Sequence, residues 1–236
     1  MFDRSARIYD LVYGGVKEYD AEARELAGLI QNRNPSASSL LDVACGTGRH
    51  LELLRSWFPD AAGVDVEPAM LEVAAARLPG VPFTLADMRT FDLGRTFDAV
   101  TCLFSSVGYC ADGDELAAAV GRMASHLSTG GVLVIDGWIR PEDWLPGIGL
   151  HAIAGEDETV AAARVSRSWR DGERTVLEMR YLIATAEGFE EEQERHVLTL
   201  FTDEDYRSAF AAAGLAFEVV GGPMGPSRDR YVAVAG

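Results

Sequence analysis

The sequence is poor in cysteine and has no long apolar run. Its 236 residues include three cysteines, Cys45, Cys102 and Cys110, with no Cys-x-x-Cys pair and no histidine at ligand spacing. We therefore expect neither a disulfide framework nor a bound metal. No stretch approaches the roughly 20 apolar residues of a membrane helix, and the N-terminus lacks the basic start and apolar run of a signal peptide. These absences predict a cytoplasmic protein.

Positive charge is also scarce. The chain has 21 lysines and arginines against 37 acidic residues, a formal net charge of −16. Such a chain repels the phosphate backbone of nucleic acid and an anionic membrane surface. We therefore expect a small-molecule substrate and no nucleic-acid or membrane partner, and a homodimer stays open. The hydrophobic fraction of 48% is typical of a folded globular protein, and the length favours a single domain over residues 1–236.

Predicted strands and helices alternate along most of the chain. Apolar runs predict strands at 40–43, 61–64, 82–85, 97–104, 132–136, 216–220 and 231–234. Helical patterns cover 20–31, 49–57, 68–77, 115–126 and about 202–213. The last helix begins with Thr202 and Asp205 at capping-box spacing. This order is typical of an α/β fold with a mostly parallel, Rossmann-like sheet covered by helices on both faces.

Residues 137–201 interrupt this alternation. Runs at 159–169 and 175–185 alternate in strand fashion around Asp171-Gly172, and Asp-Gly between alternating runs is a strong hairpin signal. A third run at 195–201 is placed to complete a small antiparallel sheet. The segment is too short and too charged to own a large core, so we predict an insertion that lies over the main sheet and is not a separate domain.

A glycine-rich turn follows the first predicted strand. Residues 40–48 read Leu-Leu-Asp-Val-Ala-Cys-Gly-Thr-Gly, a pattern that lets a ligand approach backbone N–H groups at the start of a helix. Asp65 ends the next strand, about 20 residues later, where an acidic residue binds ribose hydroxyls. Asp87 ends the third strand. All three strand ends lie on the carboxyl edge, where open α/β sheets bind their ligands.

Two cofactors suit this edge, and the spacing favours one of them. A nicotinamide dinucleotide needs the form Gly-x-Gly-x-x-Gly, but Leu51 stands where the third glycine belongs. S-adenosylmethionine carries no phosphate and tolerates acidic neighbours. Asp42, beneath the turn, is well placed for that ligand, and its alternative role is to tie the turn to neighbouring backbone.

At these residues the sequence resembles the class I S-adenosylmethionine-dependent methyltransferases, with Ala44 at the first glycine position of that family's motif. It is more narrowly similar to the nucleotide-sugar N,N-dimethyltransferases of macrolide antibiotic biosynthesis. Four stretches carry this similarity: 38–48, 104–108 (Phe-Ser-Ser-Val-Gly), 164–166 (Arg-Val-Ser) and 198–201 (Leu-Thr-Leu-Phe). The resemblance implies the class I fold, S-adenosylmethionine as cofactor, dimethylation of the amine of a dTDP-linked deoxyamino sugar, and 137–201 as the substrate lid.

The resemblance also implies the residues of the site. Those expected to hold the cofactor are Tyr9, Tyr19, Asp42, Ala44, Cys45, Gly46, Gly48, Asp65, Val66, Met70, Asp87, Met88 and Leu103. Those expected to hold the sugar and its nucleotide are Phe104, Ser105, Ser106, Trp138, Arg164, Ser166, Tyr181 and Arg228. Tyr109 has the position of a residue beside the acceptor amine. We interpret it as catalytic, orienting the amine or relaying its proton, with a cavity-wall role as the alternative. His196 fits a residue on a sheet face.

Other functions are compatible with the same motifs. The protein is alternatively an O- or C-methyltransferase acting on another natural product, a cofactor-binding module without chemistry, or a dehydrogenase. Calorimetry with S-adenosylhomocysteine and with NAD separates the last from the others.

Overall fold

Seven strands form one central sheet in the computed structural model, which describes residues 6–15, 17–222 and 228–236. They are β1 (Ser39–Val43), β2 (Asp60–Asp65), β3 (Phe83–Leu85), β4 (Phe97–Cys102), β5 (Leu127–Asp136), β10 (Phe217–Val220) and β11 (Arg230–Val234). Their order is β10-β11-β5-β4-β1-β2-β3. β1 to β5 run parallel, and β11 is antiparallel to both neighbours. The predicted mostly parallel α/β sheet is confirmed.

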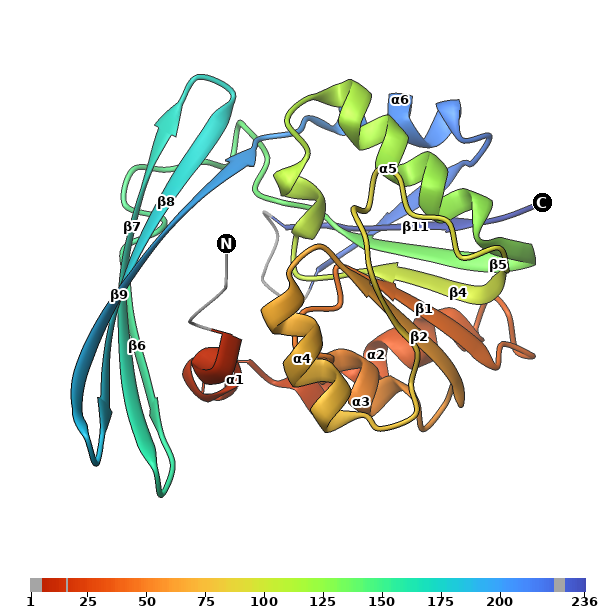
Figure 1. Ribbon diagram of the computed structural model, residues 1–236. Helices are drawn as coiled ribbons and strands as arrows, with labels where there is room; N and C mark the ends of the chain where they lie inside the picture. Colours follow the sequence, from red (N-terminus) through yellow and green to blue (C-terminus); the bar gives the residue numbers. More distant parts are fainter. Residues whose placement is uncertain (1–5, 16, 223–227) are drawn as a thin grey trace.

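Helices cover both faces of this sheet (Figure 1). Neighbouring residues of β1 point to opposite faces, as strand geometry requires: Leu41 packs in the cluster under α5 (Gly113–Ser125) and α6 (Asp203–Ala212), whereas Leu40 packs with α2 (Tyr19–Gln31) and α3 (Arg49–Leu54). α4 (Pro68–Arg77) follows β2. Because both faces are buried, the central strands read as continuous apolar runs. Thr202 and Asp205 form the predicted capping box.

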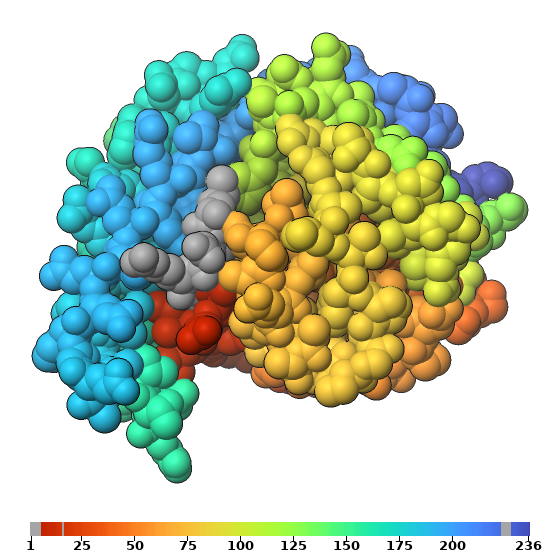
Figure 2. Space-filling view, viewed as in Figure 1, coloured from red at the N-terminus to blue at the C-terminus, as the bar shows by residue number. Residues whose placement is uncertain are grey.

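Residues 151–199 form a second, antiparallel sheet of order β6-β7-β8-β9. Its strands are β6 (His151–Glu156), β7 (Val160–Asp171), β8 (Arg174–Thr185) and β9 (Gly188–Thr199). β7 and β8 pair up to Asp171 and Arg174, so the predicted Asp-Gly hairpin has a two-residue loop. This sheet stands beside the larger one, at its carboxyl edge, and does not lie over it (Figures 1 and 2).

A short helix, α1 (Ala6–Gly14), lies between the two sheets (Figure 1). Its apolar residues Ile8 and Val12 pack on the inner face of the small sheet. Gly155 of β6 permits this approach, because a Cβ there would lie 2.0 Å from the Leu11 carbonyl oxygen of α1. In the space-filling view, α1 is visible in red between the cyan and blue strands and the orange helices (Figure 2).

Several predicted boundaries differ from the structure. α1 and β6 were not predicted, and β9 begins at Gly188, earlier than the predicted 195. The helix predicted over 49–57 ends at Leu54, and β5 begins at Leu127, ahead of the predicted 132. β6 contains alanine and glycine, which have low strand propensity, so pairing with β7 determines its conformation. Among the described residues, no helix is long and apolar enough to cross a membrane.

Candidate functional site

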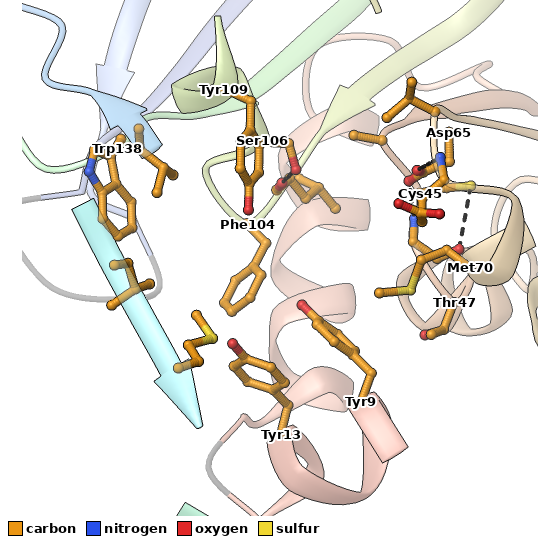
Figure 3. Close-up of a pocket in the computed structure, with 18 of the residues that line it drawn as sticks. Tyr9, Tyr13, Cys45, Thr47, Asp65, Met70, Phe104, Ser106, Tyr109 and Trp138 are labelled. Carbon is orange, nitrogen blue, oxygen red and sulfur yellow. Dashed lines mark hydrogen bonds between the residues drawn. The ribbon is translucent and has the colours of Figure 1, made fainter. Parts of the chain in front are cut away.

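A cavity of about 570 Å³ lies between the carboxyl ends of β1 to β4, α1 and the inner face of the small sheet. This volume is within the range of small-molecule sites. All the predicted site residues line it except Gly48, Ser105 and Tyr181. Figure 3 shows Tyr9 and Tyr13 projecting from α1, Asp65 and Met70 on one side, and Trp138 on the other. The cavity therefore joins residues from the core sheet and from the predicted lid.

The glycine turn adopts a left-handed backbone at three positions. φ is 57° at Ala44, 54° at Gly46 and 73° at Gly48. Asp65 holds the turn: its Oδ2 accepts the Gly46 N–H at 2.8 Å, and its Oδ1 accepts the Glu67 N–H at 2.9 Å. Gly48 faces α4 instead of the cavity, and a Cβ there would lie 3.2 Å from a side chain of that helix. Gly48 thus permits close packing of the turn on α4.

We expect Ala44→Gly to increase the stability of the free protein. A left-handed alanine costs roughly 1–2 kcal/mol, and the greater unfolded-state freedom of glycine offsets about 0.5–1 kcal/mol of that gain. The expected net increase in the free energy of unfolding is therefore about 0.5–1 kcal/mol, measured by urea denaturation. Ala62→Gly, within the ordinary strand backbone of β2, is the matched control and loses stability. A loss at position 44 as well would contradict the argument.

Carboxylates gather at the core-sheet end of the cavity. Asp42 is buried, and its Oδ1 accepts a hydrogen bond from Thr101 Oγ1 at 2.7 Å. Burial raises the pKa of Asp42 to about 7 and also raises the pKa of Asp65. Hydrogen bonds from Arg89 instead lower the pKa of Asp87, which is less buried. This end of the cavity is an acidic, partly desolvated environment that favours a ligand carrying positive charge and hydroxyl donors.

We expect Asp42→Asn to flatten the pH dependence of stability. The folded pKa of Asp42 is raised above its unfolded value, so the folded state binds the extra proton. Stability is therefore lost as pH rises from about 4 to about 7, by up to about 4 kcal/mol. The asparagine keeps the acceptor for Thr101 and removes this loss. Thermal unfolding at pH 5 and pH 8 measures it, with Asp98→Asn, at the opposite end of the sheet, as control. Equal slopes in Asp42→Asn and the unsubstituted protein would contradict the expectation.

A strained backbone elbow follows β4. Phe104 and Ser105 both have left-handed backbones, with φ of 55° and 62°, a conformation that non-glycine residues hold only when their surroundings impose it. The Phe104 N–H donates to Asp136 Oδ2 at 3.0 Å, and Ser105 Oγ donates to the Gly137 carbonyl at 2.6 Å. Ser105 is therefore occupied in holding the elbow and does not face the cavity. The elbow presents the Phe104 ring to the cavity, with Lys17 Nζ 4.2 Å from its centroid.

Two arginines mark the lid end of the cavity. The Arg164 guanidinium is buried, lies 4.7 Å from the Tyr13 ring and donates to the Tyr13 hydroxyl. Within the described part of the chain its Nε has no hydrogen-bond partner and no carboxylate pairs with it. Arg228 stacks on Trp138 at 4.3 Å, and burial lowers its pKa to about 10. Ser166 Oγ donates to a backbone carbonyl before β6. A buried cation without a carboxylate favours an anionic ligand.

Tyr109 lies on the wall between these two ends, on η1 (Ser106–Tyr109). Its hydroxyl is 2.8 Å from His196 Nδ1, and His196 Nε2 is 3.2 Å from Glu194 Oε2. Tyr181 does not line the cavity, and its hydroxyl donates to the same Glu194 oxygen at 3.1 Å. His196 was predicted as a residue on a sheet face, and the structure adds a specific partner on the cavity wall.

Tyr13, Lys17, Glu194 and His196 are site residues that the sequence did not single out. Lys17 is the only lysine in the chain, which was a usable signal: it is largely buried, and it contacts Glu22 at 3.1 Å and lines the cavity. The other three depend on the docking of α1 and β9, which no local pattern predicts. Groups of three or more potential metal ligands are absent from the residues that the structure describes.

Comparisons with known proteins agree with this geometry. A methyltransferase domain model matches residues 40–131. The dTDP-3-amino-3,6-dideoxy-alpha-D-glucopyranose N,N-dimethyltransferase of Streptomyces fradiae is 45% identical over 225 residues, covering 93% of this chain and 87% of the relative. The crystal structure of Streptomyces venezuelae DesVI has a TM-score of 0.92 and 43% identity, covering 98% of each chain.

A third match contains the cofactor. The structure of SAM-bound CalS10, an amino pentose methyltransferase from Micromonospora echinaspora, has a TM-score of 0.84 and 44% identity, and the match covers 94% of each chain. The acidic end of the cavity here, built on a glycine turn with a carboxylate at the next strand end, suits the same cofactor. The chain therefore belongs to the S-adenosylmethionine-dependent methyltransferases, in the family that includes the sugar N,N-dimethyltransferases.

Proposed function

We propose that this enzyme transfers two methyl groups from S-adenosylmethionine to the amine of a dTDP-linked deoxyamino sugar. The observation that carries the proposal is the division of the cavity into an acidic end on the glycine turn and a cationic end on the lid. The acidic end suits a sulfonium, an amine and ribose hydroxyls, whereas the buried Arg164 suits a diphosphate. The similarity to sugar N,N-dimethyltransferases supports the same substrate class.

On the cofactor side, Asp65 accepts the ribose hydroxyls while it holds the turn, and Asp87 with Met88 borders the adenine. Asp42 faces the charged methionyl part. Tyr9 and Tyr19 from the N-terminal helices close the cavity above the turn. S-adenosylmethionine supplies an activated methyl group on a good leaving group, so these residues need only hold it in one orientation. Proximity and orientation contribute roughly 7–11 kcal/mol to such a step.

On the acceptor side, Arg164 and Arg228 bind the diphosphate, and Ser166, Ser106 and Trp138 line the sugar site. Phe104, presented by the strained elbow, separates the acceptor site from the cofactor site. Residues 137–201 act as the substrate lid within one methyltransferase domain. Because Gly48, Ser105 and Tyr181 lie outside the cavity, their roles in this proposal are to position the turn, the elbow and Glu194.

Mass spectrometry of the reaction products tests the proposal. With S-adenosylmethionine and a dTDP-linked amino sugar, we expect successive mass gains of one and two methyl groups. The matched sugar with a hydroxyl in place of the amine is the control and stays unmodified. Methylation of the hydroxyl sugar at an equal rate would favour an O-methyltransferase, and no mass gain on the amino sugar would reject the substrate class.

Location and oligomeric state complete the proposal. A cytoplasmic location suits the three cysteines, which are all buried and unpaired. A homodimer is supported by Val165 and Leu182, which are 61% and 47% exposed on the outer face of the lid sheet. Analytical ultracentrifugation tests the dimer.

A further inference from the structure

The proposed acceptor presents a problem of protonation. An alkyl amine has a pKa near 10, so at neutral pH it reaches the site as an ammonium ion with no lone pair for attack. Each methyl transfer therefore requires that one proton leave the nitrogen first. Tyr109 alone is unsuited to accept it, because burial raises the pKa of this phenol above its usual value. The proton needs a further acceptor behind the tyrosine.

Such an acceptor contacts Tyr109. His196 is fully buried on β9, with its Nδ1 2.8 Å from the Tyr109 hydroxyl and its Nε2 3.2 Å from Glu194 Oε2. A carboxylate accepts hydrogen bonds, so in the neutral imidazole the proton is on Nε2 and Nδ1 is the acceptor. Tyr109 therefore donates to His196, and its oxygen lone pairs remain directed to the cavity. Figure 3 shows the Tyr109 hydroxyl pointing into the cavity toward Phe104.

Packing fixes this contact between two parts of the chain that are far apart in sequence. A Cβ at Gly108 would lie 3.0 Å from Leu198 Cδ2, so glycine is needed for η1 to approach β9. Thr199 Oγ1 donates to the Cys110 carbonyl at 2.7 Å, which ties β9 to the residue after Tyr109. Two of the four stretches that carry the family resemblance, 104–108 and 198–201, meet at this contact.

We propose that Tyr109, His196 and Glu194 form a proton relay that deprotonates the substrate amine once for each methyl group added; this rests on the proposed function. The ammonium N–H proton passes to the Tyr109 oxygen as the Tyr109 O–H proton passes to His196 Nδ1, and Glu194 stabilises the imidazolium. The freed nitrogen lone pair forms the N–C bond to the methyl group, and the S–C bond breaks with its electrons remaining on sulfur. Water takes the proton from His196 when the products leave. Tyr109 contacts the substrate, whereas His196 and Glu194 are positioning residues that act through it.

Other titratable and charged groups surround the relay. Tyr13 from α1, Asp65 from β2 and Glu194 face Tyr109, and Arg164 from β7 and Tyr181 from β8 lie beside Glu194 and Tyr13. Among these, only His196 combines a direct contact with Tyr109 and an ordinary pKa near neutrality.

The test is the pH dependence of kcat at saturating substrate for His196→Gln and Tyr109→Phe. At pH 7 we expect kcat to fall at least 100-fold in each, the usual scale of general-base catalysis. The loss then shrinks about tenfold per pH unit up to the pKa of the amine, because bulk water now supplies the free amine. A purely structural defect does not recover with pH. A loss that is constant from pH 7 to 9.5, or no loss, would overturn the relay.

Controls separate the relay from folding and from the proposed function. His126→Gln removes another buried histidine, which bonds Leu93 and Arg122 away from the cavity, and retains the pH profile of the unsubstituted enzyme. Calorimetry with S-adenosylhomocysteine shows whether each variant is folded. If His196→Gln does not fold, Glu194→Gln gives the same pH-dependent recovery from a smaller loss, and a flat profile in that variant also overturns the relay. Failure of the unsubstituted enzyme to methylate the amino sugar overturns the proposed function instead.

Discussion

Arg164→Ala is expected to raise the KM for the dTDP-linked sugar by about 30-fold or more. Arg164 is buried, carries an Nε without a partner and has no carboxylate beside it in the described chain. Removing one member of a buried, hydrogen-bonded charge pair costs about 2–5 kcal/mol of binding, and a substrate diphosphate is the proposed second member. kcat falls less than KM rises, because the reacting amine is at the other end of the sugar. Steady-state kinetics measures both parameters.

Two controls make this prediction specific to the diphosphate. Arg167→Ala removes an arginine of the same strand that is exposed and pairs with Glu178, and we expect its KM to be unchanged. Inhibition by dTDP weakens in parallel with KM in Arg164→Ala, whereas binding of S-adenosylhomocysteine does not change. The stability of the free protein does not fall, since a buried cation without a carboxylate partner is costly to keep. An unchanged dTDP inhibition constant would remove Arg164 from the substrate site.

Asp65→Ala is expected to weaken cofactor binding by about 1–3 kcal/mol, which is about 5- to 150-fold in Kd. Two effects act together: the ribose hydroxyls lose their acceptor, and the Gly46 and Glu67 N–H groups lose the carboxylate that holds the turn. Titration calorimetry with S-adenosylhomocysteine measures the loss. Asp65→Asn retains one acceptor oxygen and has an intermediate Kd.

Asp60→Ala is the matched control for this prediction. Asp60 begins the same strand, is exposed and pairs with Arg95, so its removal leaves cofactor affinity unchanged. An unchanged Kd in Asp65→Ala would show that neither the ribose contact nor the turn depends on this carboxylate.

The sequence predicts the core sheet better than the lid, for a physical reason. The strands and helices from 39 to 136 have strong local signals: buried apolar runs, the helix-starting Pro68, and glycines where the backbone is left-handed. Their order restricts the topology, and the carboxyl edge then brings Asp42, Asp65 and Asp87 together. The cofactor end of the cavity follows directly.

The lid depends on contacts between distant segments. The small sheet was predicted with three runs, and the fourth strand, β6, exists because it pairs with β7 and packs on α1. Ser105 and Tyr181 were expected in the substrate site, but their hydroxyls bond Gly137 and Glu194. Local patterns identify such residues as important without indicating which partner they have. The pairing of Tyr109 with His196 is another contact that only the packed structure reveals.

The two sides of α1 differ in how firmly they are attached. Toward the glycine turn it is held by polar contacts: Asp10 accepts from Thr47 Oγ1 at 2.8 Å and pairs with Arg77, and both charged groups remain partly exposed. Toward the lid it is held by apolar burial of Ile8 and Val12. Solvent-screened polar ties open more readily than apolar ones. This asymmetry favours a processive cycle, in which spent cofactor is exchanged while the once-methylated sugar stays under the lid for its second methyl group.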